Sequence, residues 1–156
     1  MNLSRTSLST IVVSALMTLS GCGGGSYSSA AAADTFATRV NAAYASFATV
    51  SGLTSTAVAD LFDSKYLDMS FTKTIVLDAL KASAAALGTT AELSLFPLAQ
   101  ITSPVISNCD ANNVCTLNAT LVNSDADTTS VEFSTKVIIV SGVIYFYGDQ
   151  SSTPSI

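Results

Sequence analysis

The sequence lacks histidine and tryptophan altogether, and only 11% of its 156 residues are charged. Histidine is the most common general base near neutral pH and the most frequent metal ligand, so its absence disfavours both catalysis and metal binding. The charges that are present form no basic stripe, which argues against a nucleic-acid partner. From these absences we expect no cofactor, no metal ion and no nucleic acid.

Cysteine is scarce as well, with three residues in the chain. Two of them, Cys109 and Cys115, enclose a short segment rich in turn formers, as the run NCDANNVC shows. In an exported protein such a close pair predicts a disulfide that clamps a turn between two strands. The alternative is a metal site, which needs further ligands that histidine is not there to supply.

The chain begins MNLSRTSLSTIVVSALMTLSGC, with one positive charge at Arg5, a short apolar core and an end of small residues. This layout is typical of a secretory signal, and the core is too short to remain as a membrane-spanning helix. The last four residues, Leu19-Ser20-Gly21-Cys22, resemble the lipobox of bacterial lipoproteins. In that family the chain is cut before the cysteine, whose thiol receives a diacylglycerol carrying fatty acids such as palmitate. The alternative is a plain secretory signal with an incidental cysteine.

The resemblance implies three parts: a lipoprotein signal peptide over residues 1–21, a lipidated Cys22 with a flexible Gly/Ser/Ala tether over residues 22–33, and a single domain over residues 34–156. Because Gly23 rather than aspartate follows the cysteine, it also implies an outer-membrane protein that faces the periplasm of a Gram-negative bacterium. Loss of Arg5 with the signal leaves 5 basic and 11 acidic residues, a net charge of −6 (5 − 11). Acyl chains rather than charge are therefore expected to hold the protein on an anionic membrane.

Apolar residues recur at spacings of three and four in the first half of the domain, which predicts helices over residues 34–50, 56–62 and 72–87. Asp34 is the expected N-cap of the first helix and Gly52 its stop, while Gly88 is the expected C-cap of the third. One face of the third helix is apolar and is expected to face the core: Ile75, Val76, Ala79, Leu80, Ala84 and Leu87.

After Gly88 the apolar residues alternate, which predicts strands. An extended stretch over residues 91–106 is interrupted by Pro97, which suggests an edge strand or a bulge. Further strands are expected near residues 115–121, 131–139 and 143–150. Ser141-Gly142 is a two-residue hairpin signal, and residues 124–129 form another hairpin loop. The chain therefore predicts an α+β domain in which three N-terminal helices pack on a curved four-stranded antiparallel sheet.

This order of elements, with LFDSKYLDMS before the long helix and GVIYFYGDQ at the end of the sheet, is similar to the nuclear-transport-factor-2-like superfamily over residues 35–150. In the final run, residues 146–150 match the family pattern, and Ile144 stands where tryptophan is usual. The resemblance implies a cystatin-like cone, in which the sheet curls around the helices and encloses a pocket. Six aromatic residues either line that pocket or fill it as core: Tyr44, Phe47, Phe62, Tyr66, Phe133 and Phe146.

Alternation in the last strand places Ile144 and Phe146 on one face and Tyr145 and Tyr147 on the other. Apolar residues on the outer face suggest a homodimer or an envelope-protein partner at the two tyrosines. The alternative is that the tyrosines simply tolerate partial exposure.

Two classes of function remain open. The first is a non-catalytic lipoprotein of the cell envelope that binds a small apolar ligand or a protein partner. The second is a small pocket enzyme of the isomerase, dehydratase or cyclase type, with an aspartate base among Asp60, Asp63 and Asp68. Aspartates in such positions are more often caps and solvated turns, so we expect the first class and no catalytic residue.

Overall fold

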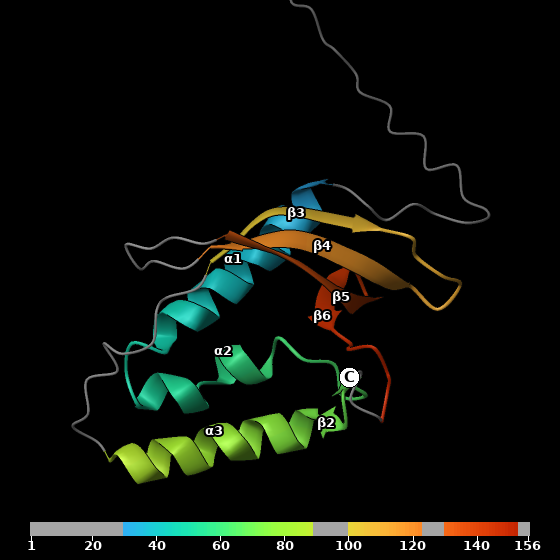
Figure 1. Cartoon of the computed structure of the whole chain (residues 1–156). Coiled ribbons are helices and arrows are strands. Elements are labelled where there is room, and N and C mark those ends of the chain that lie inside the picture. The colour runs from blue at the N-terminus through green and yellow to red at the C-terminus, as the bar shows by residue number, and fades with distance from the viewer. Residues whose placement is uncertain (1–29, 89–99, 123–129, 153–156) are drawn as a thin grey trace, which may run out of the picture.

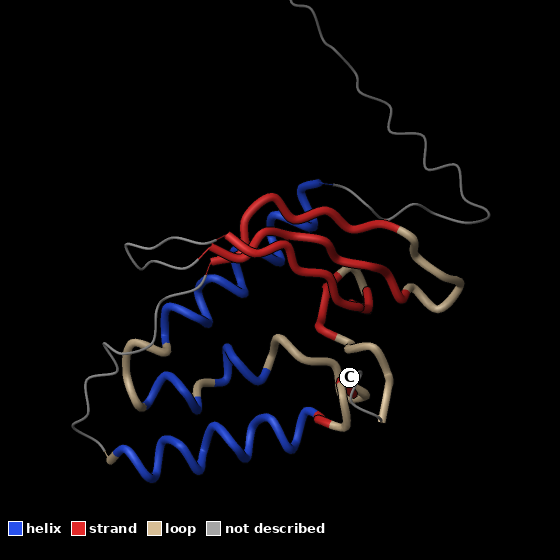
Figure 2. The backbone as a smooth tube through the Cα atoms, viewed as in Figure 1, coloured by secondary structure: helices blue, strands red, loops and turns tan. Residues whose placement is uncertain are grey.

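The computed structural model describes residues 30–88, 100–122 and 130–152 (Figure 1). The predicted signal peptide, Cys22 and most of the tether lie outside the described residues, as do residues 91–99 with Pro97 and the loop at residues 124–129. No helix in the described part of the chain is long and apolar enough to cross a membrane. The fold is α+β, with a curled antiparallel sheet of four strands and three α-helices (Figure 2).

The sheet is the predicted meander, in the order β3-β4-β5-β6. Its strands are β3 (Gln100–Ser107), β4 (Val114–Val122), β5 (Ser130–Val140) and β6 (Val143–Phe146). Alternation along each strand places one set of apolar side chains on a single inner face, as expected for a half-buried sheet. The buried members of this set are Ile101, Ile106, Cys115, Leu117, Ala119, Val137, Ile139 and Ile144. The predicted hairpin is confirmed, because Ser141 and Gly142 have φ values of 51° and 80° between paired Val140 and Val143.

Helix α1 (Ala30–Ser46) covers the inner face of the sheet and packs mainly against β3 and β6 (Figure 1). Its buried residues are Ala33, Phe36, Ala37, Val40 and Ala43. Asn41 also closes the free edge of β3: its Nδ2 donates to Ile101 O at 3.0 Å, and its Oδ1 accepts from Ile101 N at 2.7 Å. The side-chain amide thus takes the place of a neighbouring strand.

The bounds of α1 differ from the prediction at both ends. The helix begins four residues before Asp34, within the run of alanines assigned to the tether, because alanine has the highest helix propensity and Ala33 is buried. Asp34 is therefore not an N-cap. The helix ends at Ser46 rather than near Gly52. Gly52 lies instead in the 3₁₀ helix η1 (Ser51–Thr54), where an added Cβ would come 1.6 Å from Ser46 O.

The predicted core face of α3 (Lys73–Leu87) is wrong, since none of its residues is buried. The helix contacts η1 and β2 (Phe71–Thr72), and it lies beyond η1 and α2 (Thr56–Ala59), away from the four-stranded sheet (Figure 1). Its partly buried apolar contacts to the core are Leu77 and Leu80, whereas Ile75 and Leu87 are 47% and 41% exposed. Helical spacing shows which residues share a face but not what that face packs against. The inner face of the sheet is already covered by α1, so α3 packs elsewhere. Gly88 is confirmed as the C-cap, with a φ of 73° and its N–H donating to Ala84 O.

Two features of the strands were not anticipated. A short hairpin joins β1 (Leu67–Asp68) to β2 through Met69 and Ser70, whose φ values are 46° and 73°. Such a turn is usually built from Asn and Gly, so the sequence carries no signal for it. In β3 the register shifts between Thr102 and Val105, next to Pro104. Proline has no N–H to donate to a ladder, so within sheets it is found at edge strands and bulges, as here.

The last strand ends at Phe146, four residues earlier than predicted, because the chain then turns onto the segment before β1. Phe146 N donates to Leu61 O at 2.8 Å, and Leu67 N donates to Tyr147 O at 3.1 Å. Gln150 N in turn donates to Leu67 O at 2.9 Å. Gly148 allows this approach, because its φ is 76° and an added Cβ would lie 2.2 Å from Leu67 O.

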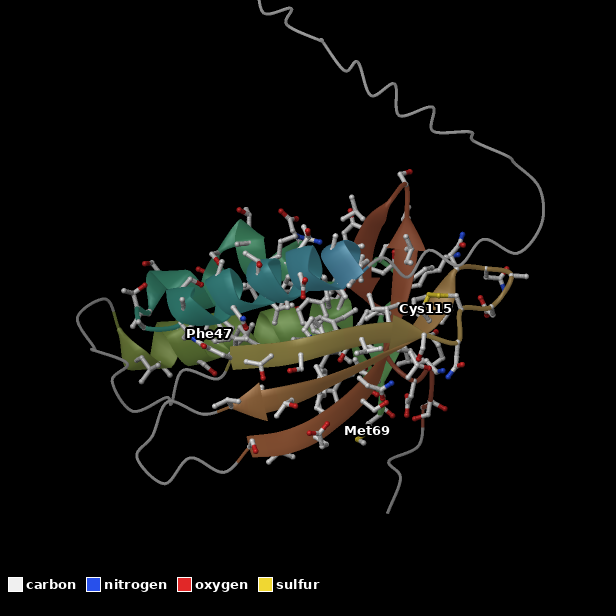
Figure 3. All side chains as sticks on the ribbon, turned by 90° about the horizontal axis from the view of Figure 1, so that it is seen from above. Phe47, Met69 and Cys115 are labelled. Carbon is white, nitrogen blue, oxygen red and sulfur yellow. A yellow bond between two sulfur atoms is a disulfide. The ribbon has the colours of Figure 1, made fainter. Side chains whose placement is uncertain are left out.

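The predicted disulfide between Cys109 and Cys115 is confirmed, with an S–S distance of 2.06 Å (Figure 3). It closes the loop between β3 and β4. Inside this loop, Asp110 Oδ1 accepts hydrogen bonds from Asn112 N at 2.8 Å and Val114 N at 2.9 Å. The loop is therefore held both covalently and by its own aspartate.

Removal of the disulfide by the double substitution Cys109→Ala and Cys115→Ala should lower the free energy of unfolding by about 2 kcal/mol, because the bond restrains a short loop in the unfolded chain. Urea denaturation measures this loss. Alkylation of the denatured wild-type chain should label neither cysteine until a reductant is added. Labelling of either one without reductant would contradict the assignment.

Gly148→Ala should destabilise the protein more than Gly142→Ala. Both glycines have positive φ, so each substitution should cost about 1 kcal/mol of backbone strain. No atom lies within 4 Å of a Cβ added at Gly142, whereas one added at Gly148 meets Leu67 O. We therefore expect a further loss of about 1–3 kcal/mol for Gly148→Ala, measured as a lower urea midpoint. Equal midpoints for the two variants would show that the C-terminal segment does not dock as described.

Candidate functional site

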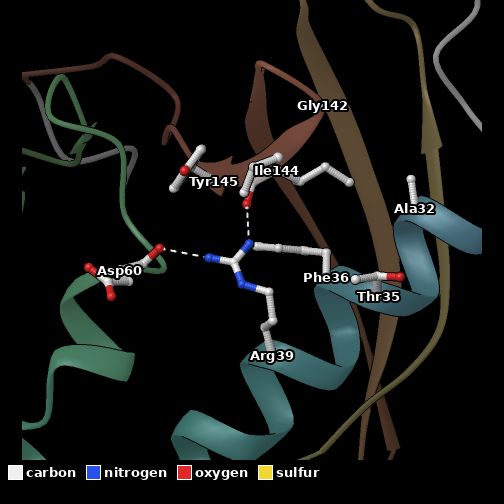
Figure 4. A pocket seen from close by; sticks show the side chains of 9 residues that line it. Ala32, Thr35, Phe36, Arg39, Asp60, Gly142, Ile144 and Tyr145 are labelled. Carbon is white, nitrogen blue, oxygen red and sulfur yellow. Dashed lines mark hydrogen bonds between the residues drawn. The ribbon is translucent and has the colours of Figure 1, made fainter.

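A groove of about 470 Å³ lies between α1, the end of α2 and the β5–β6 hairpin (Figure 4). Helix α1 provides Phe36 and Arg39, and the hairpin provides Val143 and Tyr145. Asp60, which follows α2, lies at the rim. The groove therefore combines residues from three separate parts of the sequence, and its size is in the range of small-ligand sites.

Arg39 is the positively charged residue that lines this groove. Its Nη1 donates to Ile144 O at 2.9 Å and its Nη2 donates to Asp60 O at 2.8 Å. The guanidinium carbon lies 5.5 Å from the ring centroid of Tyr145 and 6.0 Å from that of Phe36. These contacts favour a cation beside the rings and fix the guanidinium in place. No sequence motif marks Arg39; the one available signal is that it is the only arginine outside the predicted signal peptide.

The three candidate aspartates, Asp60, Asp63 and Asp68, do not line a common pocket in the described part of the chain. Only Asp60 lines the groove, and its carboxylate points away from Arg39, which contacts the backbone oxygen (Figure 4). Asp63 Oδ1 accepts a hydrogen bond from Lys65 N at 2.8 Å. Asp68 Oδ1 accepts one from Asp149 N at 3.4 Å. Asp63 therefore stabilises a local turn, whereas Asp68 joins β1 to the C-terminal segment.

All six aromatic candidates are partly buried. Five of them pack directly against the hydrophobic core, and the sixth, Tyr66, packs on the ring of Phe62. Phe62 is central to this packing, with its ring centroid 4.8 Å from that of Tyr66 and 5.8 Å from that of Phe146. The Tyr44 and Phe47 rings meet edge to face at 5.6 Å. None of the six lines the Arg39 groove. Their packing is that of core residues, and a role in lining an enclosed cavity stays a prediction.

Burial raises the pKa of two of these tyrosines above the ordinary value. For Tyr44 the cause is desolvation of the phenol. For Tyr66 desolvation is again the main cause, and the nearby negative charges of Asp68 and Asp149 add to it. Both phenols therefore remain protonated at neutral pH and can act as hydrogen-bond donors but not as bases.

The structure places Tyr145 and Tyr147 in different surroundings. Tyr145 lines the Arg39 groove, whereas Tyr147 lines a second hollow of about 540 Å³. Its wall includes Lys136 and Ile138 of β5, and three residues of the segment closed by the disulfide: Asp110, Asn112 and Val114. It therefore lies where the outer face of the sheet meets the C-terminal segment.

Asp149, at the rim of the second hollow, is fixed by its own turn. Ser151 donates to its two carboxylate oxygens, from the backbone N–H at 2.7 Å and from the hydroxyl at 2.9 Å. These hydrogen bonds lower the pKa of the Asp149 carboxyl below its usual range. Within the residues that the structure describes, no group of three His, Cys, Asp or Glu side chains is placed to hold a metal ion.

Comparisons with known proteins assign no family to the chain. No family model matches the chain, and no curated protein matches it in sequence. Among solved structures, the chain is similar to Aln2 from a Streptomyces species, with 13% sequence identity and a TM-score of 0.38. That alignment covers 73% of this chain and 87% of the Aln2 chain.

Proposed function

We propose that this chain is a lipid-anchored lipoprotein of the bacterial cell envelope whose domain is a non-catalytic binding module. The lipobox residues ending at Cys22 support the anchor. The Cys109–Cys115 disulfide supports export, because such bonds persist in oxidising compartments such as the periplasm. The absence of aspartate after Cys22 supports the outer membrane of a Gram-negative cell as the site of attachment.

The observation that carries the binding role is the fixed guanidinium of Arg39 in an open groove. A cation held by two backbone oxygens and flanked by two aromatic rings is suited to recognition, because its position is set before any ligand arrives. Acid–base catalysis needs a titratable side chain directed at the substrate. Asp60 is exposed and directed away from the guanidinium, which favours binding over the aspartate-dependent enzyme.

We also propose the nuclear-transport-factor-2-like superfamily as the family of the domain. Three observations support it: the order of helices and strands, the curl of the sheet, and the Gly148-Asp149-Gln150 run that follows the last strand. In this chain the run docks the C-terminal segment onto Leu67. A cone of this kind could hold a small apolar ligand among the aromatic residues.

For the outer sheet face we propose a second copy of the chain as the partner. Val114, Ile138 and Tyr145 are paired side by side across β4, β5 and β6, which makes one end of this face apolar. Lys136 and Glu132 lie four residues apart on the same face of β5. A two-fold axis between them would place each lysine against the glutamate of the other copy, which gives a self-complementary contact.

Intact-mass analysis of protein purified from membranes tests the anchor. The wild-type chain should begin at Cys22 and carry acyl chains, whereas Cys22→Ser should give a chain without lipid that is lost from the membrane fraction. Cys109→Ser serves as the matched control, because it also replaces a cysteine by serine, here one that is disulfide-bonded, but should leave the acyl mass unchanged. A free thiol at Cys22 in the wild-type protein would refute the lipoprotein assignment.

Sedimentation analysis of the full chain carrying Cys22→Ser tests the dimer. The protein should sediment as a dimer. Tyr147 lines the second hollow together with Val114 and Ile138 of the apolar end, so Tyr147→Lys should bury a charge there and shift the protein to a monomer. The control is Ser83→Lys on α3, which adds the same charge to an exposed position. A wild-type chain that remains monomeric at high concentration would rule out a second copy as the partner.

A further inference from the structure

The free edge of β6 presents an unpaired backbone donor to the Arg39 groove. Phe146 N–H donates to Leu61 O, and Phe146 O accepts from Asp63 N, so both backbone groups point away from β5. In an antiparallel strand the backbone groups of every second residue point to the same side, so the N–H and C=O of Ile144 also point away from β5. Ile139 of β5 is the residue that pairs with Ile144. Its N–H donates to Asn113 O, on the side of β5 away from β6, so Ile139 does not bond to Ile144. Among the residues that the structure describes, nothing therefore accepts a hydrogen bond from Ile144 N–H.

This unpaired N–H is enclosed, since Ile144 is only 3% exposed and lines the groove. Buried backbone N–H groups in native proteins are almost always hydrogen-bonded, to protein, to water or to a ligand. The carbonyl of the same residue is already bound by Arg39 Nη1. Ile144 thus has its acceptor satisfied and its donor open on the side that faces the groove.

The guanidinium beside it also has donors to spare. Arginine carries five N–H groups, and Arg39 uses one on each Nη for Ile144 O and Asp60 O. The other N–H groups have no partner in the described part of the chain. A carboxylate suits these donors, because its two oxygens can accept from Ile144 N–H and Arg39 at the same time and its charge complements the guanidinium.

We propose that this groove binds a carboxylate carried on a small apolar body, as found in a short organic acid or at the C-terminus of a peptide. One carboxylate oxygen accepts from Ile144 N–H and the other from Arg39. The apolar body lies against Phe36 and Val143. Val143 is 39% exposed without a ligand, so it has surface to bury. The proposal rests on the proposed binding role and gives that role a ligand class.

The surrounding charges allow an anion here. The Asp60 carboxylate points away from the guanidinium, so it does not occupy the position proposed for the ligand (Figure 4). The net negative charge of the chain repels anions at long range, but salt screens this repulsion beyond about 8 Å. At the groove itself the nearby cation dominates. A neutral ligand of the same shape would keep the apolar contact and lose the charged hydrogen bonds.

The test is an NMR titration of the ¹⁵N-labelled full chain carrying Cys22→Ser, with N-acetyl-leucine as the probe and its neutral amide as the matched control. The acid should shift the Ile144 backbone amide downfield in a saturable way, with a dissociation constant on the order of 1 mM. The amide should bind at least about tenfold more weakly. Equal effects of the two probes, or no change at Ile144, would overturn the proposal.

Two variants separate recognition from charge in general. Arg39→Gln should weaken the acid at least about tenfold, and Lys81→Gln, which removes one positive charge from α3 outside the groove, should leave the affinity unchanged. An acetylated tripeptide ending in leucine distinguishes the sources of the carboxylate. Tighter binding than the single amino acid indicates a peptide C-terminus, and equal binding indicates a small acid. If the acid, the Arg39→Gln variant and the tripeptide all fail to give the expected results, the carboxylate proposal is wrong. The proposed lipid anchor and dimer are tested separately, by intact mass and by sedimentation.

Discussion

The packing of α1 on the inner face of the curled sheet is the interaction on which the rest of the structure depends. Phe36 and Val40 of this helix are almost fully buried in the same core cluster as Leu117 and Val137 of the sheet. Each large side chain buried in this way stabilises the fold by about 1.5–3 kcal/mol. The same helix places two polar residues at the two edges of the sheet. Asn41 bonds to the backbone of β3, and Arg39 bonds to that of β6. One helix therefore covers the core and also hydrogen-bonds to the backbone of both edge strands, β3 and β6.

A second set of contacts joins the helical layer to the sheet. The segment around Leu61 and Leu67 runs beside the end of β6 and the turn that follows it, with a parallel bridge between Phe62 and Phe146. Across this junction the ring of Phe146 contacts that of Phe36 edge to face and that of Phe62 at a tilt. Because this junction also sets the position of Asp60 O, it fixes the second acceptor of Arg39. The groove exists because both sets of contacts are satisfied at once.

Local signals in the sequence were reliable where the physical cause is itself local. The strand alternation, the Ser141-Gly142 hairpin, the Gly88 cap and the disulfide each depend on residues that lie close together in the chain. Predictions failed where distant residues decide. The apolar face of α3 predicts a place in the core, but α1 occupies that position. The alternation after Val143 predicts a strand as far as Gln150, but the chain leaves the sheet after Phe146 and bonds to Leu67 instead.

The fold class, the meander of the sheet and the position of the disulfide can be predicted without the structure, because they follow from side-chain periodicity and short-range turn chemistry. The proposed lipid anchor depends entirely on residues before the folded domain. Arg39 becomes a candidate site residue only in the folded chain. Its partners, Asp60 O and Ile144 O, are backbone atoms 21 and 105 residues away, and a backbone oxygen has no residue type for a sequence pattern to record.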